Sequence, residues 1–297
     1  TTTSDAVSVR ITVLYHCKQT GSTDDDNTYA ASYEAVGRKF PHVNMLRETD
    51  FAVQLRAFTD EALVPGPAGN DSTILFAVDD VFFFEKFDLS YASSLLHRNP
   101  SVFAFHCKLH PHVTFCHPAN KPAVVPSFRA TRAKNMYNSL LTFDRSEGST
   151  DWNYPWDLCC SLYRAKDVLF FLDAIEASFG QDGISHPNKL EANGALIATS
   201  NEHVRKHLSD IAPKCGCPRI PIMAVITVNR VQSVYKNRIY DMATSEGQAS
   251  RDEKTTEKLF CANRTMRFDT LHYQRADFNS VHMGDFVRSE SLPSSLV

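Results

Sequence analysis

The sequence has no apolar run long enough to cross a bilayer. Its longest apolar stretch, residues 74–84, is interrupted by Asp79 and Asp80, and the polar N-terminus lacks the apolar core of a secretory signal. We therefore expect a soluble chain with no membrane segment. The sequence does not fix the compartment, although the cytoplasm is favoured. Because it does not begin with Met, excision from a longer protein stays open.

An excess of charge of one sign is also missing. The 31 basic and 34 acidic residues give a net charge of −3, which leaves no surplus for phosphate backbones, so we expect no nucleic acid partner. Eight cysteines in 297 residues are few for a disulfide framework, and reduced thiols are expected. We find no internal repeat and no Gly-rich phosphate loop of the G-x-x-x-x-G-K type, which excludes solenoids and P-loop enzymes.

What is present is an alternation of strand-like and helix-like segments. Strands are expected at residues 9–15, 43–46, 73–78 and 102–106, and helices at residues 28–40, 51–63 and 91–97. This rhythm predicts an α/β fold with a mixed, mostly parallel sheet flanked by helices on both faces. The continuous apolar run at 73–78 predicts a buried central strand. Ligands of such sheets bind at the carboxyl ends of the strands.

The second half is less regular. Residues 111–151 are rich in Pro, Asn, Ser and basic residues, and we expect one helix there, at 129–141. A helix at 167–179 has one apolar stripe and ends at Gly180, and a strand is expected at 220–228. We expect one compact domain with two halves.

The most informative local feature is the acid pair Asp79-Asp80 inside an apolar run. Burying an unpaired carboxylate is costly, so the pair is expected where the strand ends, facing a cation. Mg²⁺ or Mn²⁺ takes carboxylate oxygens and can hold a diphosphate at the same time. The alternative is that the two acids form a polar turn that ends the strand.

This arrangement resembles the GT-A fold glycosyltransferases, in which a nucleotide-binding α/β sheet carries an Asp-x-Asp-type motif after a hydrophobic strand. The resemblance covers most of the chain and implies a GT-A-like single domain, with residues 1–125 as the nucleotide-sugar-binding half and residues 126–297 as the acceptor-binding half. It implies that Asp80 binds the metal ion and that Asp79 faces the donor. The sequence departs from the pattern at Val78, where many members have the first acid.

The same resemblance suggests further donor contacts. The loop after the first strand, with His16, Cys17 and Lys18, would contact the nucleotide, and Arg47 after the second strand would lie in the same pocket. The alternative for these residues is solvated loops. His282 lies in a late segment that in many members supplies a histidine to the ion or the diphosphate. The alternative is a hydrogen-bonded structural histidine.

The general base has two candidates. An inverting transferase needs a carboxylate near the acceptor hydroxyl to take its proton. The resemblance places that carboxylate well after the acid pair, at an interval that Glu191 fits. However, Asn188-x-x-Glu191 also matches a helix capping box, so a structural role stays open. In a retaining enzyme Glu191 would be a positioning group instead.

The rival candidate is Asp157. Both tryptophans of the chain and Tyr154 lie near it, which suits a carbohydrate site because sugar C–H faces pack on aromatic rings. The alternative is a surface loop whose aromatic rings anchor it to the core. The following segment, residues 159–164, resembles the strand-to-helix turn that faces the donor sugar, which makes Ser161 a candidate donor contact.

One group of possible zinc ligands competes with this interpretation. Its members lie within twelve residues: His106, Cys107, His110, His112, Cys116 and His117. The spacing is acceptable for a tetrahedral ion, but the end of a strand, two prolines and the lack of paired Cys-x-x-Cys knuckles weigh against it.

The sequence thus favours a metal-dependent glycosyltransferase that moves a hexosyl or pentosyl group from a UDP- or GDP-linked sugar to a hydroxyl of a carbohydrate or glycan acceptor. Mn²⁺ or Mg²⁺ would act as a Lewis acid on the leaving diphosphate. The first alternative is a non-catalytic carbohydrate-binding or scaffold domain, which the missing acid at Val78 favours. The second is another metal-dependent enzyme on nucleotides, such as a nucleotidyltransferase.

Overall fold

The computed structural model describes residues 9–16, 23–64, 72–78, 81–83, 85–116, 119, 121–131, 140–226, 264–268, 280–281 and 287–291. The elements of the first half are β1 (Ile11–Tyr15), α1 (Thr23–Lys39), β2 (Val43–Arg47), α2 (Phe51–Leu63), β3 (Thr73–Phe76), β4 (Val81–Phe83), α3 (Leu89–Arg98) and β5 (Val102–His106). Those of the remainder are β6 (Phe115–Cys116), β7 (Lys121–Pro122), β8 (Phe128–Ala130), β9 (Leu140–Asp144), β10 (Ser161–Arg164), α4 (Ala165–Phe179), α5 (Pro187–Ser200), α6 (Glu202–Lys206), β11 (Lys214–Pro218), β12 (Met223–Ile226), β13 (Arg264–Phe268), β14 (Ser280–Val281) and β15 (Val287–Ser291).

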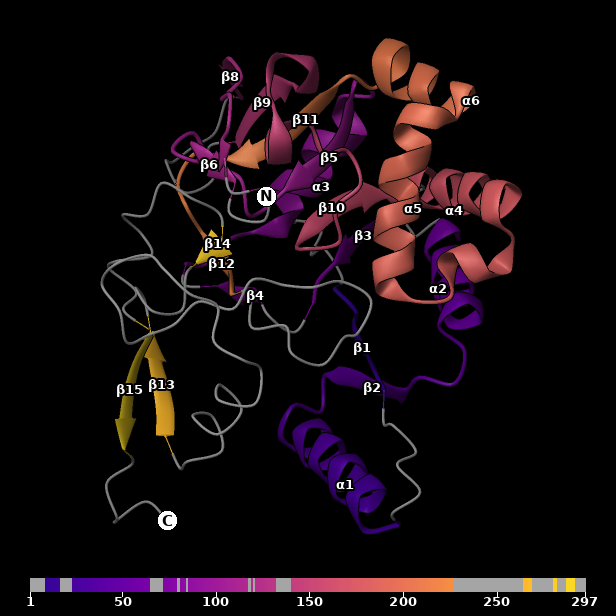
Figure 1. Ribbon diagram of the computed structural model, residues 1–297, viewed down its shortest axis with the longest axis vertical. Coiled ribbons are helices and arrows are strands. Elements are labelled where there is room, and N and C mark those ends of the chain that lie inside the picture. The colour runs from indigo at the N-terminus through magenta and orange to yellow at the C-terminus, as the bar shows by residue number, and fades with distance from the viewer. Residues whose placement is uncertain are drawn as a thin grey trace, which may run out of the picture.

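The largest sheet in the described part of the chain has six strands in the order β3-β10-β5-β11-β9-β8 and lies in the upper half of Figure 1. Strand β10 is antiparallel to both of its neighbours, whereas β5 and β11 are parallel. Strands β3, β5, β11 and β8 therefore point one way, and β10 and β9 point the other way. This is the mixed α/β architecture that the sequence predicts, and it is compatible with a GT-A-like single domain.

The position of β3 differs from the prediction. It was expected to be a buried central strand, but in the described part of the chain it is an end strand of the six-stranded sheet and is only half-buried. The reason is that β10, from the second half of the chain, lies between β3 and β5. Apolar continuity shows that a strand packs on both faces, but it does not show which strand lies beside it.

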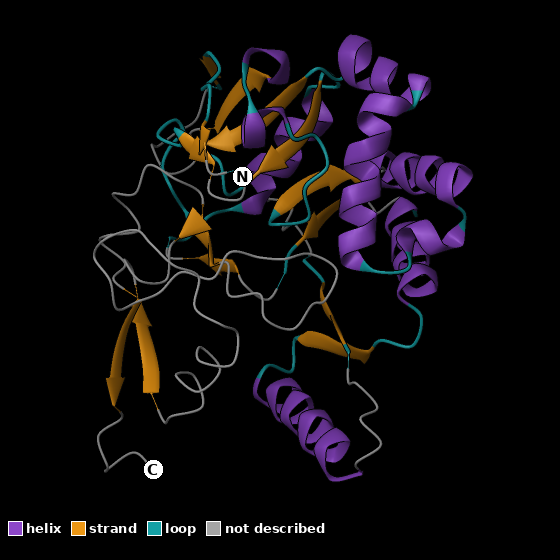
Figure 2. Cartoon of the chain, viewed as in Figure 1, coloured by secondary structure: helices purple, strands orange, loops and turns teal. Residues whose placement is uncertain are grey.

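Helices cover both faces of this sheet (Figure 2). On one face, α3 contributes Ala92, Leu95 and Leu96 to a hydrophobic cluster that includes Phe105 and Leu162 of the sheet. On the other face, α2, α4 and α5 build a larger cluster with Tyr163 and the two tryptophans. The sheet is therefore the middle layer between two cores, and each core joins residues from early and late parts of the chain.

The predicted helices in this core form for identifiable reasons. Helix α2 has the bounds that the sequence predicts, and its first turn is capped by Asp50, whose carboxylate accepts a hydrogen bond of 3.0 Å from the Val53 amide. Helix α4 buries Val168, Phe171, Leu172 and Ile175 at helical spacing. It ends at Gly180, whose φ of 70° is the left-handed conformation that glycine adopts most readily.

The helix expected at residues 129–141 is wrong at both of its ends, and residues 132–139 between them lie outside the described residues. Residues 128–130 form β8 and residues 140–144 form β9, which pair with each other, and β9 also pairs with β11. Phe128 lies opposite Phe143 across the two strands, with ring centroids 6.0 Å apart. Strand pairing and the burial of these rings override the weak helical spacing.

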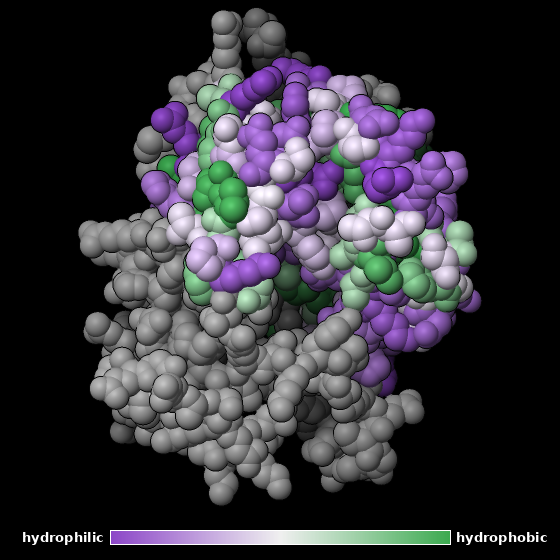
Figure 3. Space-filling model, turned by 45° about the horizontal axis from the view of Figure 1, so that its top comes forward, coloured by the Kyte–Doolittle hydropathy of each residue, from purple (hydrophilic) through white to green (hydrophobic). Residues whose placement is uncertain are grey.

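The remaining strands form smaller sheets. Strands β1 and β2 pair in parallel, and α1 packs against β2. The other sheets have the orders β14-β12-β4, β13-β15 and β6-β7. Among the described helices, none combines the length and the apolarity that a membrane span requires. On the face seen in Figure 3, polar residues cover most of the described surface, and apolar residues lie between them in small groups.

We predict that Gly194→Ala destabilises the fold. A Cβ at Gly194 of α5 would overlap the indole ring of Trp156, which is fully buried and held against Phe171. Overpacking of this kind costs about 1–3 kcal/mol of unfolding free energy, which urea denaturation measures. The matched control is Gly37→Ala in α1, where a Cβ would meet only the flexible side chain of Met45. Equal stability of the two variants would contradict the prediction.

Candidate functional site

Three strands bring their ends together at one edge of the central sheet. Strand β3 ends at Phe76 and β5 ends at His106, and both residues pair with Ser161, the first residue of β10. The carboxyl ends of β3 and β5 therefore flank the beginning of β10. Asp79 and Asp80 follow β3 in the sequence and lie outside the described residues. This edge is where an α/β sheet places its ligand.

Asp157 is the centre of a buried hydrogen-bond network at this edge. It lies in the loop that leads into β10 and is 1% exposed. Its Oδ1 accepts hydrogen bonds from the Lys108 ammonium (3.2 Å) and the Cys159 amide (3.1 Å), and its Oδ2 accepts one from the Ser161 hydroxyl (2.9 Å). These donors supply the partners that a buried carboxylate needs.

His106, the last residue of β5, extends this network through Ser161. Its Nδ1 lies 2.8 Å from Ser161 Oγ, and because the Ser161 hydroxyl donates to Asp157, His106 must donate its Nδ1–H to Ser161. Burial lowers the pKa of His106 to about 4, so the ring is neutral at pH 7. Ser161 is completely buried and bonded on both sides, so in this structure it holds Asp157 in place.

Lys108 supplies the positive charge. It follows β5, and its ammonium lies 3.2 Å from Asp157 and 3.6 Å from Asp151. Burial alone would lower the pKa of Lys108, but the negative charges around it, above all on Asp157 and Asp151, outweigh burial and raise that pKa well above its usual value. The Lys108 side chain is therefore charged, although it is only 12% exposed.

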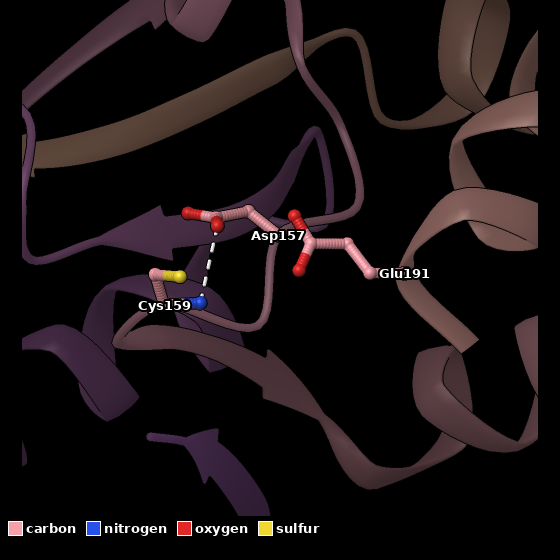
Figure 4. Close-up of side chains that lie close together, drawn as sticks. All are labelled: Asp157, Cys159 and Glu191. Carbon is pink, nitrogen blue, oxygen red and sulfur yellow. Dashed lines mark hydrogen bonds between the residues drawn. The ribbon is translucent and has the colours of Figure 1, made fainter. Parts of the chain in front are cut away.

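Glu191 approaches Asp157 from helix α5 (Figure 4). The capping-box alternative is wrong, because the N-cap is His186, whose Nδ1 accepts from the Asn188 amide, and Pro187 is the first helical residue. Glu191 lies about one turn inside the helix and is half-buried. It accepts a hydrogen bond from Tyr154, whose pKa is raised by burial and by the Glu191 and Asp157 carboxylates.

The side chains around Asp157 include three possible metal ligands. Among the described residues, the carboxylates of Asp157 and Glu191 and the thiol of Cys159 form a group whose ligand atoms lie within 4.8 Å of one another. However, both oxygens of Asp157 already accept hydrogen bonds, and a thiol is a soft ligand that Mg²⁺ and Mn²⁺ disfavour. The group is therefore a poor fit for a hard divalent ion.

The two tryptophans are core residues. Trp152 and Trp156 are 1% and 0% exposed, and their indole N–H groups donate to the carbonyls of Val113 and Leu190. Trp156 also stacks on Phe171, with ring centroids 4.4 Å apart. Neither ring can pack on a sugar in this structure. The two tryptophans therefore anchor the loop to the core, whereas Tyr154 of the same loop is half-buried and lies beside Glu191.

The remaining predicted residues lie at the ends of β1 and β2 or outside the described residues. Arg47 pairs with Tyr15 at the ends of β2 and β1, and His16 Nδ1 lies 3.4 Å from Glu48, so these two strand ends do meet. The other predicted donor and metal residues lie outside the described part of the chain: Cys17, Lys18, Asp79, Asp80 and His282.

The candidate zinc ligands do not converge in the described part of the chain. His106 is hydrogen-bonded to Ser161, and Cys107 is buried with its pKa raised by burial. Sequence reasoning missed Lys108 and the role of His106 in holding the loop. The available signal was that a basic residue follows an apolar strand, two residues after its end, which places a charge at the ligand edge of a sheet.

Comparison with known proteins found a similarity to a glycosyltransferase. The chain is 30% identical over 277 residues to the bifunctional glycosyltransferase pgtA of Dictyostelium discoideum. The alignment covers 90% of this chain but 33% of that protein, so the chain spans about one third of the length of its relative. No protein-family model and no solved structure matches the chain.

We predict that acid destabilises the fold through His106. The unfolded imidazole has a pKa of 6.5 and the folded one about 4, so the unfolded state takes up the proton first. The stability that neutral His106 provides is therefore complete above about pH 6.5 and is lost as the pH falls towards 4. Between pH 7 and pH 5 the loss is about 2 kcal/mol, measured by urea denaturation.

The test compares His106→Asn, which keeps a donor near Ser161, with wild type and with His203→Asn at an exposed position. His106→Asn should remove most of the loss, and His203→Asn should keep it. An undiminished loss in His106→Asn would show that His106 is not its source.

Proposed function

We propose that this chain is a glycosyltransferase that moves a sugar from a UDP- or GDP-linked donor to a hydroxyl of a carbohydrate or glycan acceptor, with Mn²⁺ or Mg²⁺ on the diphosphate. The observation that carries this proposal is the similarity along 277 residues to a protein named a bifunctional glycosyltransferase. The fold supports it, because a mixed α/β sheet flanked by helices is compatible with a GT-A-like domain.

In this proposal the donor binds at the edge where β3 and β5 end. Asp80 and His282 would hold the divalent ion, and Asp79, the loop at 16–18 and Arg47 would contact the donor. When bound, the ion supplies a Lewis acid for the leaving diphosphate, so that no side chain has to protonate it. The acid pair begins three residues after the last residue of β3, and this sequence position supports the arrangement.

Glu191 is the better candidate for the general base. Asp157 accepts three hydrogen bonds and is buried, so its lone pairs are engaged in holding the loop. Glu191 is half-buried and lies beside it on a rigid helix, oriented by the Tyr154 hydroxyl. In an inverting reaction its carboxylate would take the proton of the acceptor hydroxyl as that oxygen attacks the sugar. Asp157 would then be a positioning residue.

The alternative is a carbohydrate-binding or scaffold domain without activity. The missing acid at Val78 favours it, but the burial of both tryptophans removes the aromatic platform that the sequence suggested for sugar binding. An enzyme remains the function with more support.

We predict that one nucleotide sugar in a panel of UDP- and GDP-linked donors is hydrolysed or transferred when Mn²⁺ is present. Asp80→Ala should reduce this turnover by about 10²–10⁴-fold, because the ion is worth several kcal/mol of charge stabilisation. Asp60→Ala, at an exposed position of α2, is the control and should leave turnover unchanged. Full turnover in Asp80→Ala would remove the metal assignment, and no turnover of any donor would favour the non-catalytic alternative.

A further inference from the structure

Lys108 lies among acidic side chains that come from separate segments of the chain. Its ammonium contacts Asp157 in the loop before β10 and Asp151 in a short helical turn before that loop. A carboxylate oxygen of Glu191 lies within 4.8 Å of an oxygen of Asp157 (Figure 4). Asp157 thus lies close to both a cation and a second carboxylate.

Without Lys108, the carboxylates of Asp151, Asp157 and Glu191 would lie near one another without the positive charge of this side chain. The side chains of Asp157 and Asp151 are 2% and 10% exposed, so water screens their charges poorly. Two carboxylates as close as Asp157 and Glu191 disfavour joint ionisation, and one of them takes up a proton unless a positive charge offsets the repulsion. A protonated Glu191 could not accept a proton from another molecule.

We propose that Lys108 is a positioning residue that keeps Glu191 ionised, by fixing Asp157 and Asp151 and by offsetting their negative charge. The inference rests on the proposed function in one respect: the proposed reaction supplies the acceptor hydroxyl whose proton Glu191 would take. In the part of the chain that the structure describes, the charged or titratable groups placed near Glu191 include Tyr154, Asp157 and Cys159 from the loop before β10 and Lys108 from the turn after β5. Tyr154 donates a hydrogen bond to Glu191, and Lys108 is the cation in this set.

The direct test is a pH titration of the Glu191 side-chain carboxyl by ¹³C NMR in glutamate-labelled protein. The resonance is assigned by its absence in Glu191→Gln. Lys108→Gln keeps a hydrogen-bond donor for Asp157 but removes the charge, and it should raise the Glu191 midpoint by at least about one pH unit. Lys108→Arg, which keeps the charge, should restore most of that shift. An unchanged midpoint in Lys108→Gln would overturn the proposal.

A second measurement covers the case in which Lys108→Gln is too unstable to titrate. The difference in unfolding free energy between Lys108→Gln and wild type should shrink as the pH falls from 8 to 5, because a proton on Glu191 then offsets the missing cation, and the shrinkage should be smaller when both proteins also carry Glu191→Gln. A difference that stays constant over this range, or a shrinkage that Glu191→Gln leaves unchanged, would overturn the proposal.

Measurements of enzymatic activity show whether this inference or the proposed function has failed. If a donor is turned over, the acid limb of the pH profile of kcat should move upward in Lys108→Gln by the same amount as the Glu191 midpoint. If the wild-type chain turns over no donor, the proposed function fails, while the NMR titration still decides the role of Lys108. A merely structural Lys108 would lower activity without moving the pH profile.

Discussion

The buried ion pair between Lys108 and Asp157 holds this part of the molecule together. Lys108 comes at the end of β5, and Asp157 lies in the loop that leads to β10. Ser161 and His106 complete the link between the same two strands. Breaking a buried pair leaves an uncompensated charge, so this contact fixes the loop that presents Asp157 to Glu191. The geometry of the candidate site depends on it.

Much of the fold could be predicted because local signals and packing agree. Helices α2 and α4 have regular apolar spacing and clear ends, namely Asp50 before the first and Gly180 after the second. The order of the strands could not be predicted, since β10 inserts between two strands that are close together in sequence. The strands β8 and β9 were missed for the same reason, because their stability comes from a distant partner, β11.

In the candidate site, too, some features could be predicted from the sequence and others could not. The sequence makes Asp157 a candidate through its aromatic neighbours and Glu191 a candidate through its interval from the acid pair, and the structure brings the two side by side. Their different environments could not be read from the sequence, because burial and hydrogen bonds come from β5 and from the loop before β10. Spacing alone made Glu191 a candidate cap, whereas the observed N-cap is His186. The tryptophans likewise resemble a sugar platform in sequence and are core residues in three dimensions.

We propose that this chain binds a nucleoside diphosphate through a divalent ion. Isothermal titration calorimetry with UDP and with GDP, each with and without Mn²⁺, measures this binding. We expect saturable binding of one of the two nucleotides that depends on Mn²⁺. Failure of both nucleotides to bind in the presence of Mn²⁺ would refute the proposal.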